Sequence, residues 1–225
     1  MLNFEFYSPT KFYFGKNAEA HTAEAVKACG AEKVLLHTGG GSAERSGLMD
    51  RVRKTLDDAG IHYVELSGVV PNPRLELVYE GIELARKEKA DLILSVGGGS
   101  AADSAKAIAA GVPYDGDVWD FYDGSAEPEE VLPVGTIITL AATGTEGSNS
   151  SVISKTDENG VVYKRGLNVD AIRPAFSIMN PELTFTVPAY QKAAGITDIM
   201  SHILERYISN TEHVFLSDSL CEAVL

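Results

Sequence analysis

Two short glycine-rich turns are the parts of the sequence whose residue types and spacing suggest chemistry. Residues 97–100 read Gly-Gly-Gly-Ser after an apolar run, and residues 39–42 repeat these letters after another apolar run. We call residues 39–42 the first glycine turn and residues 97–100 the second. Glycines between a strand and a helix let an anionic group approach bare backbone amides, and the helix dipole favours negative charge there. The pair predicts two anion sites, or one extended ligand that touches the ends of two neighbouring strands.

The residues around these turns indicate what kind of anion to expect. The second turn matches G-x-G-x-x-A, which is a weak signal alone, and a tight turn without a ligand is the alternative. Beside the first turn, no acidic residue occurs before Glu44. An acid there would favour a free ribose 2′-hydroxyl, whereas glycines with Ser42 tolerate a 2′-phosphate. The pattern therefore favours NADP over NAD.

Two other stretches are polar and lie near the predicted strand ends. Asp103 and Lys106 are three residues apart on the helix after the second turn, and on spacing alone we expect a surface ion pair. Residues 139–148 combine small and hydroxyl side chains in one loop. Such a donor-rich loop can line a cofactor, and an ordinary polar loop is the alternative.

Asp198 and His202 are the candidate metal ligands. Asp at position i and His at i+4 project from one face of a helix, and both residue types bind metals. A surface pair is the alternative, and two ligands are too few, because stable sites use three or four. The remaining histidines have no clear claim to complete the set. They are His21, His37, His62 and His213.

Alternating apolar runs and helical patterns must position these residues. The expected strands are 33–37, 61–66, 91–96 and 134–140, and the expected helices are 17–29, 43–59, 75–89 and 101–110. This alternation predicts a parallel sheet covered by helices on both faces. An aromatic hairpin (residues 3–7 and 11–15) is expected before it, and shorter strands (151–154, 161–164 and 176–179) after it.

Beyond residue 182 only helices are expected. They cover 189–194, 196–209 and the chain from about residue 212, which we take as an incomplete helical domain at 183–225. The α/β domain then covers residues 1–182. About 40 residues are too few for a second core, so we expect that the sequence is part of a longer protein.

Composition excludes some partners. With 19 basic and 32 acidic residues the formal charge is −13, which argues against nucleic acid and anionic membranes as partners. The two cysteines suggest no disulfide framework, and we see no secretory signal and no apolar run that spans a membrane. We therefore expect a cytoplasmic location. An aromatic edge strand near the N-terminus invites pairing, so a homodimer is expected.

Taken together and in order, the motifs resemble the iron-containing (group III) alcohol dehydrogenases, in particular their NADPH-dependent butanol dehydrogenase and aldehyde reductase branch. The matching stretches are the aromatic hairpin, residues 39–42, 71–74, 97–106, 139–148, 180–184 and 193–198, with His202, Glu205 and Tyr207. Each motif is weak alone, but their order and spacing along the whole chain make the likeness specific.

The resemblance implies an NAD(P)H-dependent reduction of an aldehyde to a primary alcohol, and the reverse, with NADP(H) preferred and NAD(H) possible. It implies that the cofactor residues are Gly40, Gly41, Ser42, Asn72, Pro73, Gly97, Gly98, Gly99, Ser100, Asp103, Thr139, Thr143 and Lys164. Asp198 and His202 match the first two ligands of Fe²⁺ or Zn²⁺, which would act as a Lewis acid on the carbonyl oxygen while the nicotinamide delivers hydride. No further catalytic residue is implied.

One departure and two alternatives accompany the resemblance. Members of the family carry two more histidine ligands downstream, which this chain does not reach, so we expect weak NADP(H) binding and little or no turnover from it alone. One alternative is an enzyme like the glycerol dehydrogenases or dehydroquinate synthases, which share the architecture. The other is a nucleotide-binding module without chemistry.

Overall fold

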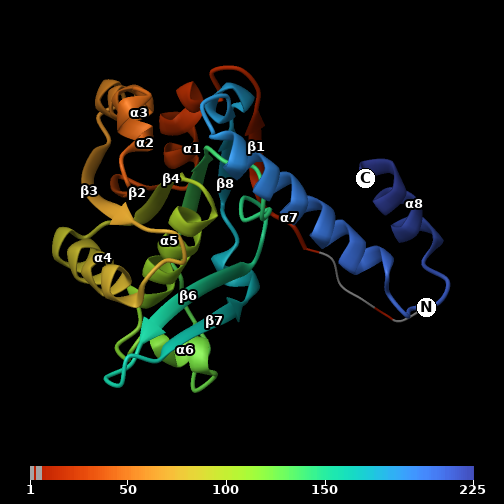
Figure 1. Cartoon of the computed structure of the whole chain (residues 1–225). Coiled ribbons are helices and arrows are strands. Elements are labelled where there is room, and N and C mark those ends of the chain that lie inside the picture. The colour runs from red at the N-terminus through yellow and green to blue at the C-terminus, as the bar shows by residue number, and fades with distance from the viewer. Residues whose placement is uncertain (1–2, 4–6) are drawn as a thin grey trace.

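Six parallel strands form one sheet in the computed structural model, which describes residue 3 and residues 7–225 (Figure 1). Their order across the sheet is β1-β8-β5-β4-β2-β3. The strands are β1 (Lys11–Phe14), β2 (Lys33–Gly39), β3 (His62–Val69), β4 (Leu92–Gly97), β5 (Val134–Ile138) and β8 (Phe176–Met179). The predicted parallel sheet is therefore confirmed, and its order brings the strands before the two glycine turns, β2 and β4, side by side.

Helices cover both faces of the sheet. They are α1 (Thr22–Ala28), α2 (Ser42–Arg45), α3 (Leu48–Asp58), α4 (Leu75–Glu88), α5 (Gly99–Gly111) and α6 (Trp119–Asp123), with short 3₁₀ helices at Ala18–His21, Asp170–Ile172 and Pro181–Thr184. Because side chains alternate along a strand, Leu35 of β2 packs into the core under α4 and α5 while Leu36 packs under α1 and α3. This double burial explains why the central strands are apolar without alternation.

A separate hairpin, β6 (Ser150–Thr156) and β7 (Val162–Asn168), lies beside the sheet (Figure 1). At its tip the Asp157 carboxylate accepts hydrogen bonds from the Asn159 and Val161 amides, and Gly160 has a φ of 78°. Ile153 and Leu167 attach the hairpin to the core that also contains α5. The hairpin is longer than the two predicted strands.

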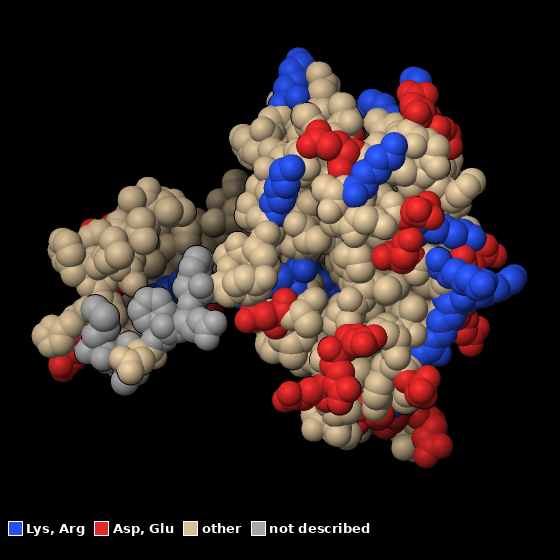
Figure 2. All heavy atoms as spheres, turned by 180° about the vertical axis from the view of Figure 1, so that it is seen from behind, with Lys and Arg blue, Asp and Glu red and all other residues tan. Residues whose placement is uncertain are grey.

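Two helices, α7 (Ala189–Tyr207) and α8 (Phe215–Val224), project away from the sheet as an arm (Figure 1). They pack against each other, and the Tyr207 hydroxyl donates to Glu222 at 2.9 Å. Seen from behind, the arm is mostly uncharged while Lys, Arg, Asp and Glu gather on the α/β part (Figure 2). No helix among the described residues is both long and apolar enough to cross a membrane.

The structure also differs from other predicted elements. The helix expected at 43–59 is broken into α2 and α3, because Gly47 adopts a left-handed φ of 70°. The two helices expected at 189–194 and 196–209 are one continuous α7, and α6 was not predicted. Of the aromatic hairpin, β1 is present, but it pairs in parallel with β8, and residues 4–6 lie outside the described part of the chain. The domain boundary after residue 182 stays a prediction.

The buried His37 of β2 generates a prediction on acid stability. Its side chain is 0% exposed; Nδ1 lies 3.1 Å from the Leu66 carbonyl oxygen and Nε2 lies 2.8 Å from the Ser104 hydroxyl. A carbonyl only accepts, so Nδ1 carries a hydrogen and donates it, and in the neutral ring Nε2 then accepts from the Ser104 hydroxyl. Burial lowers the pKa of His37 from 6.5 to about 4. Between these values the unfolded chain binds a proton that the folded chain does not, so stability falls as pH falls.

We therefore expect His37→Asn to reduce the acid sensitivity of folding, since Asn keeps a donor near Nδ1 and cannot be protonated. Between pH 7 and pH 5 the wild type should lose about 2 kcal/mol more unfolding free energy than the variant. Urea unfolding at both pH values measures this difference. His62→Asn, at an exposed position on β3, is the control and should follow the wild type; equal losses in all three proteins would contradict the prediction.

Candidate dinucleotide-binding site

The two glycine turns meet at one edge of the sheet. The first turn follows β2 and the second follows β4, and these strands pair in register, with Thr38 opposite Val96. The next strand, β5, pairs Ile138 with Gly97 and leads into the loop 139–148. Three of the predicted cofactor segments therefore lie together at the carboxyl ends of parallel strands, where ligands of open α/β sheets bind.

Two adjoining cavities lie at this edge, of 320 Å³ and 630 Å³. The smaller is lined by both glycine turns, including Gly97, Gly99, Ser100 and Gly41. Ser42, Ala43, Gly98, Thr139, Leu140 and Gln191 line both cavities. Together they have the volume of a small-molecule or cofactor site.

The second turn has the backbone geometry that an anion needs. Gly98 caps α5, no side chain occupies the cap, and the first turn of the helix contains no acidic residue. A Cβ at Gly97 would lie 2.9 Å from the Ala101 Cβ, and one at Gly99 would lie 2.9 Å from the Thr143 Oγ1. Glycine is therefore needed here for close packing, while the free N–H groups of the first helical turn suit a pyrophosphate.

Other predicted cofactor residues line neither cavity. They are Gly40, Asn72, Pro73, Asp103, Thr143 and Lys164. Thr143 packs against the second turn, and the Lys164 ammonium donates to the Asn72 side-chain oxygen at 2.8 Å. Their binding roles stay predictions.

Asp103 and Lys106 do not form the expected surface pair. Lys106 is 0% exposed, and its ammonium donates to the carbonyl oxygens of Thr145, Ser148 and Ser150, each at 2.9 Å. The Asp103 carboxylate accepts from the Thr145 hydroxyl at 3.1 Å and from the Val152 amide at 3.2 Å. The expectation was wrong because the loop 139–148 and β6 cover this face of α5. Burial lowers the pKa of Lys106 to about 8, and Asp103 opposes that shift.

The larger cavity contains a buried carboxylate that was not predicted from the sequence. Glu19 is 3% exposed, and it accepts hydrogen bonds from the Arg51 Nε at 3.0 Å and from the Asn180 side-chain amide at 2.9 Å. All three residues line the cavity. Asn180 belongs to a stretch that carried the resemblance, but no sequence pattern connects it with Glu19, since the contact joins distant parts of the chain.

The predicted metal ligands lie together on α7. The Asp198 Oδ1 is 3.7 Å from the His202 Nε2, and the side chains are 42% and 47% exposed. Among the described residues, no group of three or more His, Cys, Asp or Glu side chains could hold a metal ion. Because stable sites use three or four protein ligands, this pair alone does not make a metal site, and its metal-binding role stays a prediction.

The buried ammonium generates a second prediction. Lys106→Met should lower the free energy of unfolding by about 3 kcal/mol, because three carbonyl oxygens lose their donor in a buried place. Amide hydrogen exchange in the loop 139–148 should accelerate more than in α3. Lys54→Met is the control, since Lys54 is exposed and, within the described part of the chain, forms its ion pair with Asp58 alone. A loss below about 1 kcal/mol would show that water replaces the ammonium without cost.

Comparisons with known proteins agree with this geometry. The family model described as iron-containing alcohol dehydrogenase matches residues 9–181. The chain is 46% identical, over its whole length, to NADH-dependent butanol dehydrogenase A of Clostridium acetobutylicum, and 32% identical to the NADPH-dependent aldehyde reductase YqhD of Escherichia coli. It covers 57% of each of these relatives.

A solved structure shows the same fold. The crystal structure of NADH-dependent butanol dehydrogenase A from Thermotoga maritima superposes with a TM-score of 0.94 at 42% identity, over 98% of this chain and 55% of that one. The butanol dehydrogenase of Clostridium acetobutylicum is named as NADH-dependent and YqhD as NADPH-dependent, so these two relatives do not decide between NAD and NADP. Since the family model and these relatives agree, the chain belongs to the iron-containing alcohol dehydrogenase family.

Proposed function

We propose that this chain binds NAD(P)H as part of an oxidoreductase that interconverts an aldehyde and a primary alcohol, with NADP(H) preferred. The observation that carries the proposal is the meeting of both glycine turns on neighbouring parallel strands, where they line two adjoining cavities. The relatives are named as butanol dehydrogenases and an aldehyde reductase. A small aldehyde is therefore the proposed substrate.

In this proposal the chain acts mainly by holding and orienting the cofactor. The amides at the start of α5 bind the pyrophosphate, and Thr139 contacts the nucleotide where the two cavities join. Lys106 keeps the loop that begins at Thr139 in place. When bound, the nicotinamide would supply hydride to the carbonyl carbon of the substrate, or accept it in the reverse direction.

Asp198 and His202 are proposed as two of the ligands of a divalent metal, Fe²⁺ or Zn²⁺. Carboxylate and imidazole suit either ion. When bound, the metal would supply Lewis-acid polarisation of the substrate carbonyl. The rest of the donor set must come from residues outside the described group, so we propose that the 225 residues alone turn over little or no substrate.

Gly98→Val tests the cofactor site directly. A Cβ at Gly98 would meet only Leu140, at 3.5 Å, so the fold accepts a side chain that projects into both cavities. We expect affinity for NADPH to fall at least about 10-fold, while the melting temperature without ligand stays close to that of the wild type. Calorimetric titration measures the NADPH affinity of the variant and of the wild type, and the affinity of Gly98→Ala should lie between the two. Unchanged affinity in Gly98→Val would overturn the proposed site.

The reaction requires a second experiment on the protein purified from its source. Three quantities are measured on the same sample: the intact mass, the metal content and the rate of butyraldehyde reduction by NADPH. Asp198→Asn and His202→Asn should each lower metal content and activity together, while NADPH affinity stays within about 2-fold of the wild type. Cofactor binding without metal or turnover would instead support the non-catalytic module, and glycerol oxidation without aldehyde reduction would support the glycerol dehydrogenase alternative.

We also propose that β1 pairs two copies of the chain in a homodimer. Among the described residues β1 is at the end of the sheet order, and Phe14 is 73% exposed on it. Exposed aromatic edge strands favour pairing. Phe14→Lys should shift sedimentation towards the monomer, and a monomeric wild type would contradict the proposal.

A further inference from the structure

Three arginines follow the first glycine turn closely in sequence: Arg45, Arg51 and Arg53. Each could meet an anion bound at that turn, so their present partners decide which of them is available. Arg51 donates to the buried Glu19 at 3.0 Å and to the Ser46 carbonyl oxygen at 3.4 Å. It is therefore committed to the wall of the larger cavity.

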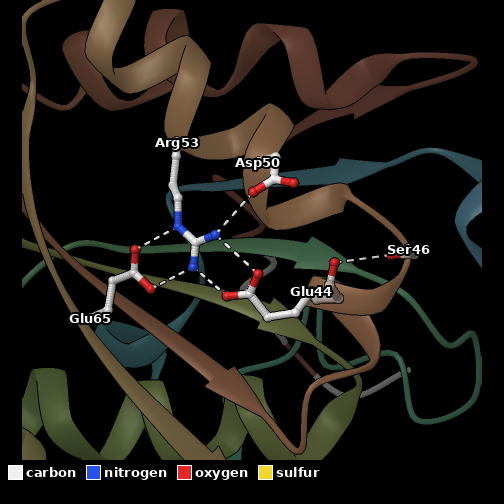
Figure 3. Close-up of polar contacts among 6 residues, drawn as sticks. Glu44, Ser46, Asp50, Arg53 and Glu65 are labelled. Atoms are coloured by element: carbon white, nitrogen blue, oxygen red, sulfur yellow. Dashed lines mark hydrogen bonds and ion pairs between the residues drawn. The ribbon is translucent and has the colours of Figure 1, made fainter.

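Arg53 is committed to three carboxylates at once (Figure 3). Its Nε and Nη2 donate to the two oxygens of Glu65 at 2.7 and 2.8 Å, a bidentate pair. Its Nη1 donates to the Glu44 Oε2 at 3.0 Å and to the Asp50 Oδ1 at 3.3 Å, and its Nη2 also bonds the other oxygen of Glu44. Every nitrogen of this guanidinium has a carboxylate partner.

The consequence concerns Glu44, which lines the smaller cavity beside the first turn. A free acid at this place would accept a ribose 2′-hydroxyl and repel a 2′-phosphate. Both oxygens of Glu44 are instead bonded to Arg53, which also holds the pKa of this carboxyl below its ordinary value. The acid nearest the turn is thus bound to a cation and turned to α3.

Arg45 is in the opposite situation. Its Nη1 lies 3.1 Å from the point where a Cβ at Gly41 would be, so the cation rests against the first turn. In the described part of the chain, no hydrogen bond or ion pair uses its guanidinium. A planar fork of donors with no protein acceptor suits a phosphate.

We propose that Arg45 binds the 2′-phosphate of NADP(H), and that Arg53 is a positioning residue that keeps Glu44 from repelling it. The inference rests on the proposed cofactor function and deepens it by naming the residues that select between the two dinucleotides. Ser42, which lines both cavities, would supply a further hydrogen-bond donor to the phosphate. The choice between NADP(H) and NAD(H) then depends on Arg45, which contacts the 2′-phosphate, and on Arg53, which holds Glu44.

Small probes separate the phosphate from the rest of the cofactor. Calorimetric titration of the chain with adenosine 2′,5′-bisphosphate and with AMP compares ligands that differ only in the 2′-phosphate. Arg45→Gln should weaken the bisphosphate about 10-fold or more and AMP less than about 2-fold. Lys54→Gln removes the same charge from α3 at an exposed position and should change neither. Equal effects of Arg45→Gln on both probes, or none, would overturn the proposal.

Arg53 is tested through rescue. Arg53→Met should also weaken the bisphosphate selectively, several-fold, because it releases the Glu44 carboxylate. Adding Glu44→Gln should restore the lost affinity. A merely structural role would weaken both probes and would show no rescue. Should Arg53→Met alone fold poorly, the double variant with Glu44→Gln still reports whether bisphosphate binding survives without Arg53.

The outcomes for the inference and for the proposed function are distinct. A wild type that binds neither probe, nor NADH, nor NADPH, would overturn both. A wild type that binds NADH and NADPH equally well, with no selective effect of Arg45→Gln, would overturn the inference alone and leave the cofactor site intact.

Discussion

One buried ammonium connects the parts of the site to each other. Lys106 extends from α5 and holds three carbonyl oxygens, two in the loop that follows β5 and one at the start of β6. The same helix begins at the second glycine turn, where Gly99 packs against Thr143 of that loop. Burying a charged amine is costly unless it is hydrogen-bonded. These hydrogen bonds therefore stabilise the end of the loop that begins at Thr139, a residue of the cavity wall.

Parallel pairing supplies the second constraint. Because β2, β4 and β5 run in the same direction, all three of their carboxyl ends lie at one edge of the sheet, and short turns there meet without any long connection. Leu35 and Leu36 point into different cores, as do Ile93 and Leu94, so a slip of one residue would exchange both sets. The core packing thus fixes the register, and the register fixes the distance between the turns.

The parallel sheet and both glycine turns could be predicted, since strand length, helical periodicity and glycine spacing are local properties. The burial of Lys106 could not, because Asp103 and Lys106 at three-residue spacing look the same on a covered or an exposed helix face. The same limit applies to Arg53, whose carboxylate partners Glu44 and Glu65 come from separate elements. Gly195 was expected to lie between two helices, yet α7 continues through it. The glycine serves close packing there, because a Cβ would meet the Ala141 carbonyl oxygen.

That packing relates the cofactor loop to the candidate metal ligands. A Cβ at Gly195 would lie 2.9 Å from the Ala141 carbonyl oxygen, so α7 crosses the loop in close contact at this residue. Residues three, four and seven apart share a helix face, which puts Gln191, Asp198 and His202 on the same side of α7 as Gly195. Gln191 lines both cavities. One face of α7 therefore carries a cavity residue, the contact with the loop and the Asp/His pair. A side chain at Gly195 would push α7 away from the loop and so move the pair relative to it.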